Sequence, residues 1–217
     1  MLNINETQQQ WQDKVFESFL NLVRSPDGDF ASIGQLGNAL YETESFDVMI
    51  AFLSQTPQGK LAFEKRISLG KIDLQKFHQF PKNSLAYQYA DHMIRHDLSP
   101  LKPQIVENDY QYLTAHLTET HDIWHVVTGS NTDILGEIRL EAFYVAQLYV
   151  SRFWLALLAK NLLKAVVYDI ELGGQYLEAI SEGWTLAKQT KPLFGIDWNQ
   201  LWETPLDEIR KDLKLVP

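Results

Sequence analysis

Apolar residues recur at steps of three and four along almost the whole chain, and this helical period limits the fold more than any other feature. The first clear stripe consists of Trp11, Val15, Phe19 and Val23, and the turn residues "SPDGD" that follow end it. We find no run that alternates apolar and polar residues, as a half-buried strand would. We therefore predict an all-α fold, a single-domain multi-helix bundle over residues 1–217.

Capping residues mark where the later helices begin and end. Residue types that start helices stand at Thr56 before Pro57, at Asp73, at Asn83 or Ser84, and at Thr132 or Asp133. The ranges expected after the first helix are about 33–53 with a break near 45, 56–69, 73–80, 84–100, 104–127, 132–170, 177–188 and 205–213. The longest of these, 132–170, is apolar on nearly every side in its middle, which predicts burial or an apolar ligand.

Charge and cysteine content exclude several functions. The chain has 28 acidic and 19 basic residues, a net charge of -9, so no nucleic-acid partner is expected. Because it has no cysteine, any bound metal must rely on His, Asp and Glu. We see no targeting segment at the start, and charged residues interrupt the most apolar run, 142–170, before it could span a bilayer. We expect a cytoplasmic protein without a signal peptide or transmembrane helix.

Two histidines and two carboxylates lie around one expected helical turn. His121 and His125 are four residues apart, so their side chains point to the same side of a helix. Asp122 lies on the flank of that side. At about 1.5 Å per residue, His125 before the turn at Gly129 and Glu137 after it lie at a similar height on two antiparallel helices. The spacing therefore predicts a metal site across a helical hairpin.

The predicted ligands are His121, Asp122, His125 and Glu137. Two nitrogen and two oxygen ligands suit zinc first, with cobalt or iron as alternatives, whereas magnesium prefers oxygen ligands. The competing interpretation is a solvated helix face. His92 and His96 have the same spacing beside two aspartates and are expected at the surface, as are His78 and His116.

Other chemistries fit the motif less well. "HDIWH" has an aspartate where a zincin protease has the glutamate that acts as base. A di-iron bundle would need paired Glu-x-x-His motifs, which the chain does not have. A zinc hydrolase is the least favoured hypothesis.

The segment "HDIWHVVTGSNTDILGE" resembles the His-Asp-x-x-His-x11-Glu signature of the coenzyme Q (ubiquinone) biosynthesis protein family, the fourth Coq protein of mitochondria and its bacterial relatives. The likeness extends to "IRLEAFYVAQ", to "FPKNSLAYQYADHMIRHDLSP" and to the ending "GWTLAKQTKPLFGIDWNQLWETPLDEIRKDL". It covers roughly residues 71–213, and the first 70 residues resemble the family only in helical character.

The resemblance implies a dimeric, all-α protein at the periphery of a membrane, working with other quinone-biosynthesis enzymes. It implies binding of a prenylated quinone precursor and of a divalent metal, commonly zinc, at the four motif residues. Two accounts follow from it: an organiser of the biosynthetic complex that presents the lipid, or a metal-dependent enzyme that oxidatively removes the C1 carboxylate of a prenyl-hydroxybenzoate. A metal-independent lipid-binding scaffold is the alternative.

The apolar range after Glu137 is the expected place for the prenyl tail, in an apolar groove that starts at the ion. An ordinary core is the competing interpretation. Basic residues in the range could bind an anionic head group or extend to solvent. The candidate lipid-binding residues are Phe143, Leu148, Arg152, Phe153, Leu155, Leu158, Lys160 and Leu162.

Overall fold

The computed structural model describes residues 4–41, 43–149 and 151–215. Within these ranges it contains twelve α-helices and two short 3-10 helices, and no β-strand. Their bounds are α1 Ile4–Arg24, α2 Phe30–Leu40, α3 Thr43–Leu53, α4 Pro57–Lys65, α5 Leu74–Phe77, α6 Leu85–Arg95, α7 Asp109–Glu119, α8 His121–Thr128, α9 Ile134–Gln147, α10 Arg152–Tyr168, η1 Ile170–Leu172, α11 Gly173–Gln189, η2 Trp198–Gln200 and α12 Leu206–Leu213. The predicted all-α fold is confirmed.

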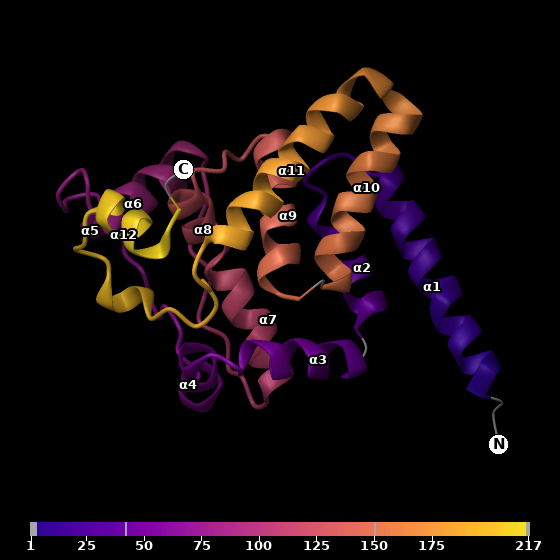
Figure 1. Ribbon diagram of the computed structural model, residues 1–217, viewed down its shortest axis with the longest axis horizontal. Coiled ribbons are helices and arrows are strands. Elements are labelled where there is room, and N and C mark those ends of the chain that lie inside the picture. Colours follow the sequence, from indigo (N-terminus) through magenta and orange to yellow (C-terminus); the bar gives the residue numbers. More distant parts are fainter. Residues whose placement is uncertain (1–3, 42, 150, 216–217) are drawn as a thin grey trace.

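The helices form two groups, and α9 stands at the border between them as a member of the first group (Figure 1). On one side α9, α10 and α11 stand side by side, and α1 runs along the outer side of α10. On the other side lie α5, α6, α8 and α12, with α3 and α4 at one end of α7. Trp154 packs against all three clusters of buried apolar side chains, so it joins the two groups.

The helices α9 and α11 pack closely against each other, and one glycine permits this approach. A Cβ added at Gly183 on α11 would collide with the backbone of Arg139 on α9. Only glycine lets two helix backbones approach this closely. This contact fixes α9, which carries Glu137, against α11.

Most of the predicted helix starts are confirmed by hydrogen bonds. The side chains of Thr56, Asp73, Ser84 and Asp133 each accept a bond from a backbone N–H in the first turn of the helix that follows. Such caps satisfy N–H groups that have no partner within the helix. The sequence therefore predicts where the N-termini of α4, α5, α6 and α9 lie.

The single long helix expected over 132–170 is wrong. The chain forms α9 and α10 instead. The first ends at Gln147 and is followed by Leu148, whose N–H donates to the Tyr144 carbonyl. Tyr149 has a left-handed φ of 59°, and its ring stacks on Phe52 at 4.9 Å. Because both helices are rich in apolar residues, folding α10 back against α9 buries more of them than a straight rod would. The range 104–127 is likewise two helices, α7 and α8, which meet at Thr120.

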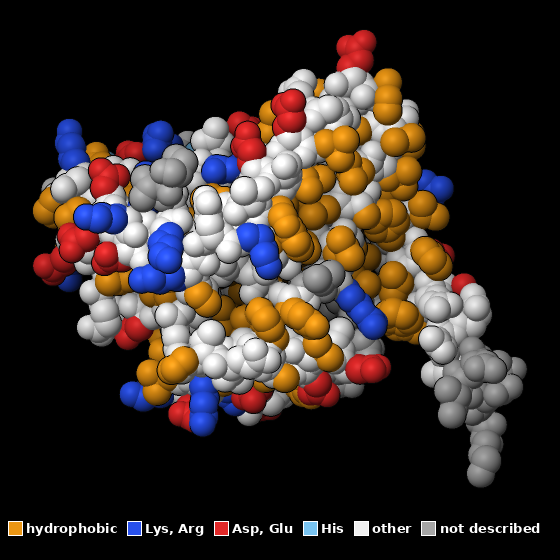
Figure 2. Space-filling view, in the orientation of Figure 1, with side chains coloured by type: hydrophobic (Ala, Val, Ile, Leu, Met, Phe, Trp, Pro, Cys, Tyr) orange, Lys and Arg blue, Asp and Glu red, His pale blue; other side chains and the backbone are white. Residues whose placement is uncertain are grey.

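Exposed hydrophobic side chains gather over α10 and α11 (Figure 2). They are Leu155, Val166, Val167, Tyr168, Ile170, Leu177 and Trp184. No helix in the described ranges is long and apolar enough to cross a membrane, as the sequence predicts.

Candidate metal centre

The turn between α8 and α9 places the three central side chains. Gly129 ends α8 with φ 69°, a conformation that favours glycine. Asp133 then starts α9, and its carboxylate accepts a 2.8 Å bond from the Gly136 N–H. From α12, Arg210 donates to the carbonyls of Val126 and Val127 at 2.9 and 3.0 Å, which satisfies two groups at the end of α8. The hairpin is thus held at both helix ends.

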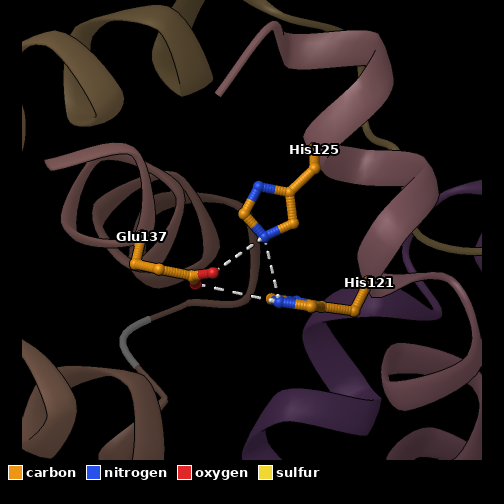
Figure 3. Close-up of side chains that lie close together, drawn as sticks. All are labelled: His121, His125 and Glu137. Carbon is orange, nitrogen blue, oxygen red and sulfur yellow. Dashed lines mark hydrogen bonds and ion pairs between the residues drawn. The ribbon is translucent and has the colours of Figure 1, made fainter. Parts of the chain in front are cut away.

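His121 and His125 of α8 face Glu137 of α9 across this hairpin (Figure 3). The two Nε2 atoms lie 3.2 Å apart, and His125 Nε2 lies 3.3 Å from a Glu137 oxygen. His121 Nε2 lies 3.9 Å from the other Glu137 oxygen. The expectation that His125 and Glu137 lie at one height is confirmed.

These distances fit one shared ion. Two ligands each about 2.0–2.1 Å from a tetrahedral zinc are about 3.3 Å apart, close to the shortest two separations in the cluster. The other ring nitrogen of His125, Nδ1, lies 3.0 Å from the Ser130 carbonyl and donates to it when it carries the proton. Such a bond fixes the tautomer that leaves Nε2 free for a metal. The residues present therefore fit a divalent cation.

Burial and neighbouring charges shift the pKa values of the two imidazoles in opposite directions. Burial, with the nearby His125 acting in the same direction, lowers the pKa of His121 to about 4 against the opposing charge of Glu137. Burial also disfavours the charged form of His125, but the hydrogen bond and charge of Glu137 outweigh burial and raise its pKa above 6.5. In return the two histidines hold the pKa of Glu137 below its usual value in spite of burial. Glu137 is thus an anion ready to bind a cation.

Asp122 lies beside the cluster of His121, His125 and Glu137, but its carboxylate faces His92. Among the described residues, the potential ligand atoms that lie within 4.8 Å of one another belong to His121, His125 and Glu137. Asp122 Oδ1 lies 3.9 Å from His92 Nε2 on α6. Although burial opposes ionisation, the nearby His92 ring and the charges of His121 and His125 hold the pKa of Asp122 below its usual value. Direct metal binding by Asp122 stays a prediction.

The surface positions expected for His92 and His116 are wrong. His92 is buried, and its ring lies 5.8 Å from the ring of His125. His116 is buried and accepts a 3.4 Å bond from the Gly195 N–H, while Nδ1 lies 3.4 Å from a Glu119 oxygen. The i, i+4 pattern of His92 and His96 could not separate a buried from an exposed imidazole, because α6 packs on α8 through contacts distant in sequence.

The candidate lipid-binding residues fall into two groups. In the core lie Phe143, Leu148, Leu158 and Lys160. Partly or largely exposed are Arg152, Phe153, Leu155 and Leu162. Two cavities of about 220 and 140 Å³ are described, and residues other than these eight line both. An apolar groove along these residues therefore stays a prediction.

Two of the basic residues in this region make defined contacts. The guanidinium of Arg152 lies over the ring of Trp11 at 5.2 Å. Lys160 lies in the buried interface between α9 and α10, where Asn161 donates a 2.8 Å bond to Glu141. Burial raises the pKa of Glu141 to about 8, although the charge of Lys160 opposes the shift. Lys160 is therefore not free to extend to solvent.

Fold and site together define an all-helical protein with a His-His-Glu cluster suited to a divalent metal. The sequence profile described as "Coenzyme Q (ubiquinone) biosynthesis protein Coq4" matches residues 3–217. The chain belongs to the Coq4 family, which confirms the resemblance and extends it to the first 70 residues.

Individual relatives agree with this assignment. The mitochondrial ubiquinone biosynthesis protein COQ4 of Zygosaccharomyces rouxii is 27% identical over 193 residues, 82% of this chain and 56% of that protein. The COQ4 homologue of Rattus norvegicus is 26% identical over 211 residues, 85% of this chain and 76% of that protein. The chain thus spans little more than half the length of the yeast relative.

A solved structure has the same fold. The crystal structure of a protein from Nostoc punctiforme, assigned to ubiquinone biosynthesis, is similar to this chain with a TM-score of 0.85. The two are 26% identical, and the match covers 95% of this chain and 99% of that one.

Proposed function

We propose that this protein binds a prenylated aromatic precursor of ubiquinone and holds its polar head at a divalent metal, most simply zinc. The observation that carries the proposal is the cluster of His121, His125 and Glu137. Two of its three edges have the length expected around one ion, and the second nitrogen of His125 is already bonded.

The cluster is open on one side. The side chains of His121 and Glu137 are 28% and 35% exposed, whereas that of His125 is 1% exposed. Three protein ligands with an approach from solvent are the arrangement of zinc sites that accept a substrate, while structural sites are closed by four. This geometry supports a role in which a head group enters beside His121 and Glu137.

Each protein group then has a defined task. Glu137 supplies the negative charge, His125 is the buried anchor, and His121 is neutral at physiological pH because burial lowers its pKa. Asp122 is proposed as a further ligand or as an orienting group through His92. A bound ion would supply Lewis acidity towards an oxygen of the head group.

The prenyl tail is proposed to follow the exposed side of α10. Phe153, Leu155 and Leu162 offer apolar surface there, and more lies on α11 (Figure 2). The same face is proposed to attach the protein to the periphery of a membrane or to a second copy of the chain. Buried residues such as Phe143 would support this surface from beneath.

Two roles fit this binding site. As an organiser, the protein presents the lipid to other enzymes of the pathway. As an oxidative decarboxylase, it releases the C1 carboxylate of the ring as CO2 and places a hydroxyl group there. The balance of that reaction requires dioxygen as oxidant, together with two electrons from a reductant and two protons, and water forms beside CO2 and the hydroxylated ring.

Mass spectrometry of lipids extracted from the purified protein tests the binding proposal. We expect a prenylated hydroxybenzoate or a related quinone precursor in the wild-type protein, and much less in the His121→Ala/His125→Ala variant. The extract of a His96→Ala variant is the control, because His96 is exposed and lies outside the cluster.

Incubation of the metal-loaded protein with a prenylated hydroxybenzoate, dioxygen and a reductant separates the two roles. Release of CO2 with formation of the hydroxylated ring supports the enzyme. Bound but unchanged precursor supports the organiser. Lipid that stays bound after complete chelation would instead favour a metal-independent scaffold, and absence of any bound lipid contradicts the proposal.

A further inference from the structure

The side chain of Tyr144 on α9 is fully buried in a stack of three aromatic rings. Its ring is parallel to that of Trp124, with centroids 4.2 Å apart and planes 5° apart. Trp154 covers the other face at 4.0 Å and 6°. Two indoles therefore fix the plane of the phenol and leave its hydroxyl no freedom to turn to solvent.

The hydroxyl of Tyr144 has no hydrogen-bond partner among the described residues. Tyr112, which is equally buried, donates a 3.0 Å bond to the Ile67 carbonyl. Buried hydroxyls are normally bonded, because losing water without gaining another partner is unfavourable. The orphaned hydroxyl of Tyr144 therefore requires an explanation that the fold alone does not give.

The position of Tyr144 on α9 places its ring beside the metal centre. It lies seven residues after Glu137, two turns along the same face of the helix. Long side chains in a helix lean towards its N-terminus, so the phenol extends back towards Glu137. The Tyr144 ring also lies 5.8 Å from the ring of His121 and 18° from parallel.

Electrostatics agree with this direction. Burial raises the pKa of Tyr144 well above its usual value, and the charges of Asp122 and Glu137 raise it further. The phenol is therefore protonated at physiological pH and carries the hydrogen that it needs to act as a donor. Neither carboxylate is its partner, because the hydroxyl has no hydrogen bond to any described residue.

We propose that the Tyr144 hydroxyl is a substrate-binding group that donates a hydrogen bond to a carboxylate oxygen of the aromatic acid bound at the metal centre. The inference rests on the proposed function. A carboxylate has two oxygens, so one can meet the cation while the other accepts from the phenol. A neutral phenol head has a single oxygen, which would have to meet both the cation and the Tyr144 hydroxyl at one point.

The substitution Tyr144→Phe removes the hydroxyl and keeps the ring between Trp124 and Trp154. Tyr112→Phe is the matched control, since it removes a buried hydroxyl that already has a partner. Without ligand, we expect Tyr144→Phe to melt at the same temperature as wild type or higher, and Tyr112→Phe to melt lower.

Binding is measured by calorimetry on zinc-loaded protein with two probes: a prenylated para-hydroxybenzoate and the same prenylated phenol without its carboxylate. Tyr144→Phe should lose about tenfold or more in affinity for the acid and less than about twofold for the phenol. Tyr112→Phe should bind both probes as wild type does. Visible spectra of the cobalt-substituted proteins, titrated with the acid, should show the same loss.

The possible failures are distinguishable. Wild-type affinity of Tyr144→Phe for the acid overturns this inference and leaves the proposed function intact. Equal losses for both probes also overturn it, because the hydroxyl would then bind something other than the carboxylate. Wild-type protein that takes up zinc but binds neither probe contradicts the proposed function itself, and this inference with it.

Discussion

At the residue scale, the two histidines of the cluster differ although they lie one helical turn apart. His125 is almost fully buried and is bonded to Ser130 and Glu137, while His121 is partly exposed on the open side of the cluster. The pKa of His125 is raised and that of His121 is lowered to about 4. A proton and a metal therefore compete chiefly for His125.

Zinc binding at pH 6 should release about one proton, and it should come from His125. Because the pKa of His125 lies above 6.5, lowering the pH through that value should weaken apparent zinc affinity up to about tenfold per unit, and affinity should level off above it. His121 adds to this loss only near pH 4. Calorimetry in buffers of different ionisation enthalpy measures the released protons.

Zinc affinity that is flat from pH 5 to 7, with no proton release, would contradict this assignment. Glu137→Gln offers an independent check. Removing the carboxylate should lower the pKa of His125, so fewer protons should be released at the same pH.

The three cluster residues could be predicted from sequence because they depend on local geometry. His121 and His125 share one helix, and Glu137 is one short turn away. The contact between Asp122 and His92 could not, since α6 comes from a distant part of the chain. The spacing of seven residues between Glu137 and Tyr144 was visible in the sequence, but nothing local showed that the hydroxyl lacks a partner.

At the scale of elements, the packing of α9 on α11 holds one side of the metal hairpin. Two glycines of α11 lie in different surroundings. A Cβ at Gly183 would collide with the backbone of Arg139, whereas a Cβ at Gly174 would meet nothing within 4 Å. The pair separates the effect of close packing from the intrinsic helix propensity of glycine.

Gly183→Ala should destabilise the protein by about 2 kcal/mol or more, because the helices must move apart. Gly174→Ala should be neutral or stabilising by up to about 1 kcal/mol. Urea unfolding of both variants measures the difference. Equal effects on the free energy of unfolding would show that the contact between α9 and α11 is not tight.

Helix starts were more predictable than helix ends. Thr56, Ser84 and Asp133 carry their capping signal in the side chain. The reversal at Tyr149 has no such signal, because a tyrosine with positive φ is imposed by packing of α10 on α9. Hydrophobic periodicity alone predicts one long helix where two apolar helices follow each other in the chain.

At the scale of the whole molecule, a buried titratable carboxyl group, that of Glu141, lies in the interface between α9 and α10. Glu141 accepts a bond from Asn161, and the charged groups around it are Lys160, Glu137 and Asp27. Because burial raises its pKa to about 8, Glu141 binds a proton in the folded state that the unfolded chain loses above about pH 4.5. Folding stability from this group is therefore highest at low pH and falls as pH rises towards 8.

The substitution Glu141→Gln should remove this fall in folding stability with rising pH. Relative to wild type, the variant should gain stability on the order of 3 kcal/mol as pH rises from 5 to 8. The amide is expected to keep a bond to Asn161. Glu178→Gln, on the exposed side of α11, is the control and should follow the wild-type profile. Parallel pH profiles of Glu141→Gln and wild type would contradict the raised pKa.

The fold class could be predicted because helical periodicity persists through the chain without any strand pattern. The buried polar interface could not, since Glu141 and Lys160 look like ordinary surface charges in an amphipathic helix. Their burial follows from the reversal at Tyr149, which brings α10 against α9. The same reversal turns the expected straight apolar rod into two packed helices.

Elemental analysis of the purified protein tests the central claim most directly. Wild type and the control His96→Ala should each contain close to one equivalent of a divalent metal per chain after loading and desalting. His121→Ala/His125→Ala should contain almost none while retaining its helical circular dichroism. Equal metal content in all three proteins would contradict the assignment of His121, His125 and Glu137 as a metal centre.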